Sequence, residues 1–324
     1  MLDLARLRSI RLHTKPWSQR LIAEGFLRFD YRHVELVLEG LETLPKTPVI
    51  YAMNHTDNYN YWPLQYALHQ RFARYTAAWV KGKNYEHPFV AWFMAATNNI
   101  PIASRGYLVT RDFVHTMRRR PTETEYRALR DGVDGGLTVD ASAVPREILT
   151  KARDMFGRRF EPTRERYDEA LDAVFGELMR CFVDLNRGAL AMGLDLLVFP
   201  EGTRSLRLSR GHIGIAQVAL HLGATIVPVG CSGSNLVYPG GSPSAKPGRI
   251  VYRFGRPMTP DAFADLAPPR TFVPFGREDE ERYGPVFQAV TDRVMDALNE
   301  LVDPEYRYAE SQHGTGTEGT HRFL

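Results

Sequence analysis

The amino-acid sequence predicts an α/β fold: a mostly parallel sheet flanked by helices, with an N-terminal helical segment and a large helical insertion. Short apolar runs alternate with helix-like segments along much of the chain, which favours parallel strands with helices on both faces of one sheet. Polar clusters follow two of these runs, at the strand ends where open α/β sheets place their ligands. The predicted strands span residues 49–53, 75–80, 100–102, 194–199, 225–229 and 250–254.

Residues 1–30 are predicted to be helical, and they are markedly basic at the start. Arg6, Arg8, Arg11 and Lys15 interrupt any apolar core of signal-peptide length, and no stretch approaches ~18 uncharged apolar residues. We therefore expect a cytoplasmic protein that is peripherally associated with the membrane. Two interpretations of this segment stay open, namely contact with the membrane and a helical lid packed on the main domain.

The main α/β domain is expected over residues 31–275, with the insertion at about 106–190. The insertion is rich in charge and shows little strand character. Apolar residues recur at helical spacing from Tyr167 to Leu185, which predicts one long amphipathic helix. The segment around 132–136, which precedes this helix, is predicted to be loop.

The C-terminal part of the chain divides into a helix and a tail. Apolar residues at helical spacing between Val286 and Leu298 predict a helix over 276–302. Residues 303–324 lack periodicity and are rich in Gly, Thr, Ser and Glu, so we expect a disordered tail.

Composition excludes several classes of function. The formal net charge of +3 is too small to predict nucleic-acid binding, although a slightly basic surface suits anionic ligands and anionic lipid headgroups. The two cysteines, Cys181 and Cys231, lack the spacing of a metal site or a disulfide framework, and the histidines are scattered. We therefore expect no bound metal and a reducing compartment.

Two polar clusters at predicted strand ends are the candidate site. The first begins with Asn54-His55, and a histidine at this position is well placed to act as a general base. The second is Phe199-Pro200-Glu201-Gly202-Thr203-Arg204-Ser205, in which the glycine permits close approach of a ligand and the arginine offers a planar fork for phosphate oxygens. Glu201 is expected to hold Arg204 in place or to hydrogen-bond a substrate hydroxyl.

Four segments in one order resemble the four sequence blocks of the glycerophospholipid acyltransferase family, which includes the 1-acylglycerol-3-phosphate acyltransferases. They are Asn54-His55, residues 81–105, residues 199–205 and Ile226-Val227-Pro228-Val229, and the resemblance covers roughly 45–105 and 190–255. It implies transfer of an acyl group from acyl-CoA or acyl carrier protein to a hydroxyl of a (lyso)phospholipid or glycerol-phosphate acceptor. It implies no further cofactor, and a membrane surface as a partner.

The resemblance also implies roles for individual residues. His55 would remove the proton of the acceptor hydroxyl, while Arg105 and Arg204 would bind the acceptor phosphate. Lys81 or Lys83 resembles a basic residue found upstream in the family. Glu201, Gly202 and Thr203 would lie in the substrate-binding loop beside Arg204.

The chain departs from the family pattern at one catalytic position. The first block of the family is His-x-x-x-x-Asp, but here Asn60 stands five residues after His55, and the nearest carboxylate is that of Asp57. Three alternatives stay open: a His55–Asn60 pair, a His55–Asp57 pair, and a weak or inactive relative that acts as a lipid- or phosphate-binding protein. A hydrolase is a further alternative, although Gly230-Cys231-Ser232-Gly233 lacks the Gly-x-Ser-x-Gly spacing of a nucleophile elbow.

Overall fold

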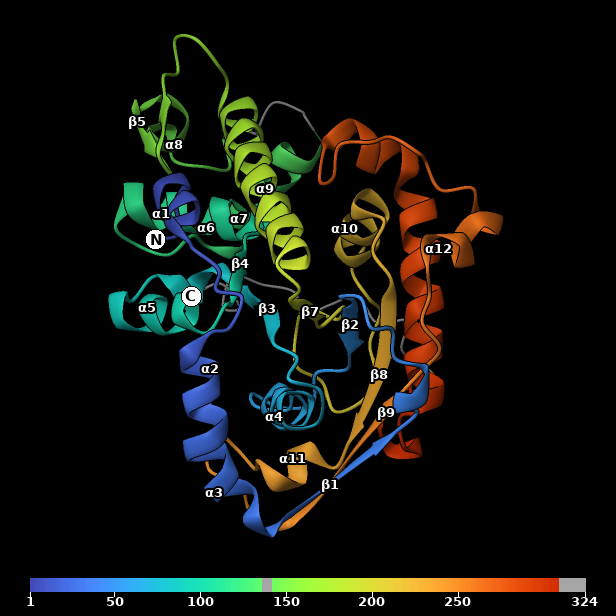
Figure 1. Ribbon diagram of the computed structural model, residues 1–324. Coiled ribbons are helices and arrows are strands. Elements are labelled where there is room, and N and C mark those ends of the chain that lie inside the picture. The colour runs from blue at the N-terminus through green and yellow to red at the C-terminus, as the bar shows by residue number, and fades with distance from the viewer. Residues whose placement is uncertain (136–141, 309–324) are drawn as a thin grey trace.

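The computed structural model of the protein describes residues 1–135 and 142–308, and its centre is a seven-stranded sheet (Figure 1). The strand order is β1-β9-β8-β2-β7-β3-β4. All neighbours pair in parallel except β8 and β9, so the prediction of a mostly parallel sheet is confirmed. The strands are β1 (Val34–Glu39), β2 (Ile50–Met53), β3 (Thr76–Lys81), β4 (Ile100–Ile102), β7 (Asp195–Val198), β8 (Ile226–Ser232) and β9 (Gly248–Phe254).

Helices cover both faces of this sheet. On one face lie α9 (Tyr167–Ala191), α10 (Gly214–Leu222) and α12 (Arg277–Leu301), and on the other lie α4 (Tyr61–Phe72) and α11 (Ser234–Val237) (Figure 1). Strands β2 and β7 are buried on both sides, and their alternate side chains enter two separate hydrophobic cores. This explains why both strands are near-continuous apolar runs in the sequence.

The six predicted strands are present, and the edge strand β1 is a further strand that the sequence pattern did not predict. Its residues are only partly buried and include Glu35 and Glu39, so its apolar signal is weak. A small antiparallel pair, β5 (Arg153–Met155) and β6 (Arg158–Phe160), was also missed inside the insertion.

The insertion is more helical than its sequence predicts. It contains α6 (Arg105–Met117), α7 (Glu123–Gly135) and α8 (Arg146–Thr150) before the long predicted helix α9. The prediction of loop around 132–136 is wrong for residues 132–135, because α7 buries Leu129 and Val133, which are four residues apart on one helix face. Residue 136 lies outside the described residues.

The N-terminal segment splits into two parts with different surroundings. Helix α1 (Leu4–Ser9) buries Leu4 and Leu7 in the core against α9, as the lid interpretation expects. The second part is a nearly continuous rod of α2 (Trp17–Leu21), the π-helical turn η1 (Ile22–Leu27) and α3 (Arg28–Asp30), which leaves several large apolar side chains exposed.

The chain stays ordered beyond the end of α12. Tyr306 is buried in the short helix η6 (Pro304–Tyr306), where its hydroxyl donates to Asn235 and accepts from the Gly233 N–H group. The predicted disordered tail is therefore wrong for residues 303–308, and its remainder, 309–324, lies outside the described residues.

The remaining short elements connect the sheet to its helices. They are η2 (Tyr31–His33), η3 (Leu41–Thr43), η4 (Gly82–Tyr85), α5 (Pro88–Ala96) and η5 (Pro260–Leu266). Within residues 1–135 and 142–308, no helix is both long enough and apolar enough to cross a membrane.

Candidate active site

Three loops meet at the C-terminal edge of the central strands. In the sheet register Ala52 of β2 pairs with Val198 of β7, and Met53 pairs with Val229 of β8. The loop that contains His55 therefore starts between the loops that follow β7 and β8. Strand β3 lies on the far side of β7, and its last residue, Lys81, projects from the same edge.

His55 is fastened to the loop after β7 at three points. Its N–H group donates to Glu201 Oε1 at 3.1 Å, and its carbonyl accepts from the Ser205 N–H at 2.9 Å. Its imidazole stacks on Phe199 with a centroid separation of 4.0 Å and an interplanar angle of 15°. The structure thus brings the two sequence clusters together into one rigid unit.

Behind His55, two buried asparagines fix the backbone and each other. The Asn54 amide donates to the Cys231 carbonyl at 2.9 Å and accepts from its N–H at 2.7 Å, which ties the loop to β8. Asn60 Nδ2 donates to the Asn54 carbonyl at 2.7 Å, and the Asn60 carbonyl accepts from the Tyr252 hydroxyl at 2.6 Å. Because Nδ2 of the Asn60 side chain is already bonded, only its Oδ1 atom is available to another partner.

The end that remains is Asn60 Oδ1, an acceptor. Both this oxygen and His55 Nδ1 are buried, and neither makes a hydrogen bond of normal geometry with the described residues. Asn60 nevertheless favours the protonated imidazole and so raises the pKa of His55. An Nδ1–H tautomer of His55 would match this acceptor and leave Nε2 with its lone pair free.

The Asp57 carboxylate makes its hydrogen bonds within its own turn and not with the imidazole of His55. Its carboxylate accepts from the Tyr59 N–H at 2.8 Å and from the Thr56 hydroxyl at 2.9 Å, and the residue is 6% exposed. Among the described residues, no hydrogen bond joins the Asp57 carboxylate to the ring of His55. The geometry therefore favours Asn60 over Asp57 as the partner of the imidazole.

The surroundings keep His55 neutral. The pKa of His55 is lowered to about 4, chiefly by burial and next by the positive charge of Arg204, with a smaller effect of Lys81 in the same direction. The side chain of Asn60 and the backbone of Asp57 act in the opposite direction. An imidazole with this pKa is unprotonated near neutral pH, as a general base must be.

The turn after β7 exposes a cation, Arg204, whose charge acts on this imidazole. Gly202 has a φ of +66°, and a Cβ atom on it would lie 2.9 Å from His212 Cδ2, so conformation and space both require glycine. Thr203 is half-buried and Arg204 is exposed. The Arg204 guanidinium forms no hydrogen bond or ion pair with residues 1–135 and 142–308.

Glu201 has a structural position that the sequence analysis did not anticipate. It is 2% exposed and bridges two backbone segments, because Oε1 accepts from the His55 N–H and Oε2 accepts from the N–H and hydroxyl of Ser209 at 2.9 and 3.0 Å. The expectation that it holds Arg204 or a substrate hydroxyl is therefore not supported. Burial raises the pKa of Glu201 to about 7.

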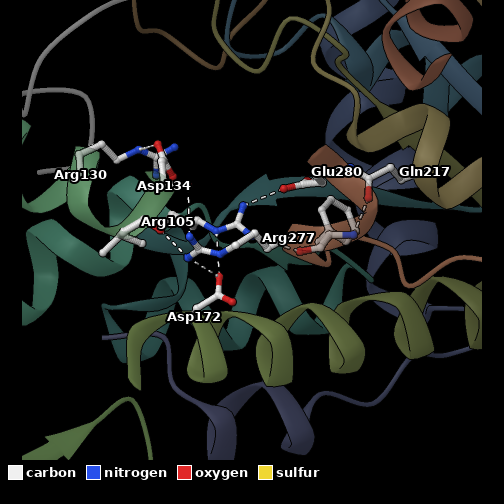
Figure 2. Close-up of polar contacts among 9 residues, drawn as sticks. Arg105, Arg130, Asp134, Asp172, Gln217, Arg277 and Glu280 are labelled. Carbon is white, nitrogen blue, oxygen red and sulfur yellow. Dashed lines mark hydrogen bonds and ion pairs between the residues drawn. The ribbon is translucent and has the colours of Figure 1, made fainter. Parts of the chain in front are cut away.

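Arg105 is committed to a different cluster, which Figure 2 shows. Its guanidinium pairs with Glu280 at 2.9 Å and with Asp172 at 3.4 Å, and it also donates to the Phe275 carbonyl. Arg277 contacts Asp172 from α12 at 3.3 Å. These contacts join α6, α9 and α12, so Arg105 serves interhelical packing here, and its predicted role as a phosphate ligand is not supported by the geometry.

The second cation that acts on His55 is Lys81, not Arg105. Its charge lowers the pKa of His55 from the end of β3, whereas Lys83 is half-buried in η4. The sequence indicated Lys81 as a candidate because it stands at the end of a predicted strand.

A cavity of about 220 Å³ adjoins the site. Tyr61 lines it and also contacts Phe199 edge-on, with ring centroids 6.2 Å apart, so the cavity is two ring contacts away from His55. Its walls come from α2, η1, α4 and α5. The apolar lining residues are Ile22, Ala23, Phe26, Leu27, Trp62, Tyr66, Tyr75 and Phe93.

The described part of the chain contains no group of three or more His, Cys, Asp or Glu side chains arranged to hold a metal ion.

Comparison with known proteins supports the resemblance seen in the sequence. The sequence model of the Acyltransferase family matches residues 35–128, which include His55 and Asn60. The crystal structure of the 1-acyl-sn-glycerophosphate (LPA) acyltransferase PlsC from Thermotoga maritima is 18% identical, with a TM-score of 0.43, over 90% of this chain and 86% of that one. No curated protein sequence matches the chain significantly. The chain is thus similar to acyltransferases over the segment that holds the first part of the site.

The bridging position of Glu201 predicts a pH-dependent effect of Glu201→Gln. Glutamine cannot accept on both sides, so the variant should lose about 1–3 kcal/mol of unfolding free energy. The pKa of Glu201 in the folded protein lies above its ordinary value, so its protonation favours the folded state, and this contribution is lost as the pH rises through about 7. The deficit of the variant should therefore be larger at pH 5 than at pH 8 in urea unfolding.

The exposed Glu42 supplies a matched control, because Glu42→Gln should change stability little at either pH. An equal deficit of Glu201→Gln at both pH values would contradict the assignment of a raised pKa.

Proposed function

We propose that the protein is an O-acyltransferase that moves an acyl group from a thioester donor to a hydroxyl of a phosphate-bearing lipid or glycerol-phosphate acceptor. The observation that supports this best is the pairing of a neutral, anchored imidazole with an exposed guanidinium that makes no ion pair with the described residues. One group suits proton abstraction and the other suits an anionic substrate. The match of the Acyltransferase family over residues 35–128 favours acyl transfer over other base-catalysed reactions.

In the proposed reaction, His55 Nε2 takes the proton of the acceptor hydroxyl as its oxygen attacks the thioester carbonyl carbon. The carbon–sulfur bond breaks, and the proton then passes from the imidazolium to the departing thiolate. A thiol has a pKa near ~8.5, so its thiolate leaves without a strong acid. Asn60 Oδ1 would accept the Nδ1–H bond and hold the ring in the correct tautomer.

The acceptor phosphate would bind at Arg204, with Lys81 as a second positive group. Both charges act on His55, so a phosphate held between them would bring the attached hydroxyl near the base. Such positioning lowers the entropic cost of alignment. Glu201, Gly202 and Thr203 would fix the shape of the loop that presents Arg204.

The donor chain would occupy the cavity behind Tyr61. Its lining combines aromatic and aliphatic side chains with several polar ones, and its Tyr61 contacts Phe199, the ring that stacks on His55. Each buried methylene contributes roughly 0.8 kcal/mol, so contacts with the apolar side chains of the lining would hold an acyl chain there. Acyl-CoA and acyl carrier protein both deliver such a chain.

Membrane association would occur through the rod of α2, η1 and α3. Trp17, Leu21 and Phe29 are each more than 60% exposed on it, and Arg28 and Arg32 lie among them. Aromatic side chains with neighbouring cations suit the headgroup region of an anionic bilayer. The packed helix α1 has no part in this surface.

A catalytically weak or inactive lipid- or phosphate-binding protein is the second candidate function. The neutral amide of Asn60 favours it, because an amide stabilises an imidazolium less than a carboxylate does. In a serine protease, the comparable Asp-to-Asn change lowers kcat about 10⁴-fold.

Substitution of the base separates these two functions. His55→Ala should lower acyl transfer from labelled acyl-CoA to lysophosphatidic acid by about 10²–10⁴-fold, the range of general-base catalysis. His115→Ala is a matched control, because His115 is exposed on α6 and should not matter. Equal transfer by wild type and His55→Ala would exclude the base assignment, and lipid binding without any turnover in wild type would favour the second candidate.

Exchange of Asp57 and Asn60 tests whether the neutral amide limits the rate. Asn60→Asp alone adds a second carboxylate to an interior that already holds Asp57, and both positions act on Cys231. Two such carboxylates repel, so one of them should be protonated and the variant less stable than wild type. The double variant Asp57→Asn/Asn60→Asp keeps one carboxylate and loses the Nδ2 donor to the Asn54 carbonyl, and its kcat/KM should exceed that of wild type by about tenfold.

Asp57→Asn alone provides the reference, because asparagine can still accept from the Tyr59 N–H group. A double variant slower than this reference would mean that Asn60 is adapted to the site of this protein.

The membrane proposal predicts a loss of lipid binding when the exposed aromatics are removed. Wild type should float with anionic vesicles at low salt. For the double variant Trp17→Ser/Phe29→Ser, the ratio of unbound to vesicle-bound protein should be at least about ten times higher. Val273→Ser is the control, because Val273 is 58% exposed in the loop before α12. Flotation that persists in the double variant would assign lipid binding to another surface.

A further inference from the structure

His55 and Arg204 belong to one rigid unit, although 149 positions separate them in the chain. Bonds on both sides of Arg204 connect this turn to the backbone of His55, from Glu201 before it and from Ser205 after it. The stack of His55 on Phe199 adds a third connection to the same loop. The separation between the imidazole and the turn that presents Arg204 is therefore fixed by the fold.

Two cations influence the imidazole. Arg204 from the turn and Lys81 from β3 place positive charge near it. The carboxylates of the two nearby acids bind other donors. Asp57 accepts hydrogen bonds from Thr56 and Tyr59 within its own turn, and Glu201 accepts from backbone N–H groups and from Ser209. Neither carboxylate bonds the ring of His55 within the described residues, and its side-chain neighbour is the neutral Asn60.

We propose that an anion bound at Arg204 strengthens His55 as a base, so that the phosphate of the acceptor itself switches on the group that will deprotonate it. The physical cause is simple: a phosphate neutralises the guanidinium, and the imidazolium that forms during the reaction no longer faces an uncompensated positive charge. The field of Arg204 is the second largest influence that lowers the pKa of His55, after burial. Only burial, Lys81 and the opposing effects of Asn60 and Asp57 would remain.

This control would discriminate between the acceptor and water. Water can reach a thioester but brings no phosphate. His55 would then keep its low pKa and be a weak base toward water. A phosphate-bearing alcohol would meet a stronger base that is already aligned with its hydroxyl. The inference rests on the proposed function for the identity of the anion, but the coupling between Arg204 and His55 is a property of the folded site and can be measured without turnover.

The test is NMR titration of the full chain labelled with ¹⁵N in its ten histidines. The ring signals of His55 are identified by their absence in His55→Gln. Titrations between pH 2.5 and pH 8 are compared in sodium chloride, inorganic phosphate and glycerol 3-phosphate at equal ionic strength. The variants are Arg204→Gln and, as the matched control, Arg207→Gln, because Arg207 is exposed three residues further along the same loop and forms no ion pair with the described residues.

We expect the titration midpoint of His55 in wild type to rise by about one pKa unit in phosphate, the order expected for one unit charge several ångströms away near the protein surface. Arg204→Gln should show a similar rise in chloride and no further rise in phosphate, whereas Arg207→Gln should behave as wild type. A stronger effect of glycerol 3-phosphate than of inorganic phosphate would identify a lipid headgroup as the natural anion, and equal effects would identify a simple phosphate site. Both results support the coupling.

An unchanged midpoint in Arg204→Gln overturns the proposal, and so does an equal effect of Arg207→Gln. Failure of the proposed function can be distinguished from failure of the coupling. A shifted midpoint in a protein that transfers no acyl group would leave the coupling intact and assign it to another reaction, whereas acyl transfer without any shift would retain the function and remove the coupling.

Discussion

The carboxylate of Glu201 joins the parts of this site, and its other features depend on that junction. Oε1 accepts from the loop after β2 and Oε2 from the loop after β7, so this side chain connects its own loop to His55, which lies 146 positions earlier in the sequence. Without this bridge, only the Ser205–His55 hydrogen bond and the stack on Phe199 would relate the imidazole to the turn of Arg204. A buried acceptor of two backbone N–H groups also satisfies donors that a loop at a sheet edge would otherwise leave unpaired. Its function is therefore architectural, although it lies inside the most chemically suggestive stretch of the sequence.

Much of the fold could be predicted because the central strands are buried on both faces. Burial on both sides requires unbroken apolar runs, and such runs are visible in a single sequence. The partly exposed edge strand β1 and the hairpin β5–β6 carry no comparable signal, so both were missed. Helix α7 was missed because its glycines suggested loop, whereas its two core contacts depend on tertiary neighbours that no local pattern reveals.

The site was predictable in its parts but not in its connections. The positions of His55 and Arg204 at strand ends followed from sequence, and the structure brings them together. The partners of Arg105 and Glu201 could not be predicted from the sequence. The residue type in a motif does not reveal whether the side chain contacts a ligand or a neighbouring part of the protein. Asp172 and Glu280, which engage Arg105, lie 67 and 175 positions away, beyond the reach of any local pattern.

Asn54 gives the sheet one additional rung made by a side chain. Its amide donates to and accepts from the backbone of Cys231, so the ladder between β2 and β8 continues one residue past the point where the strand ends. The Cys231 amide proton is therefore bonded within β8, whose residues are all buried, and we expect it to exchange slowly with solvent. His55 directly follows Asn54, so the same rung ties the backbone of His55 to the end of the sheet.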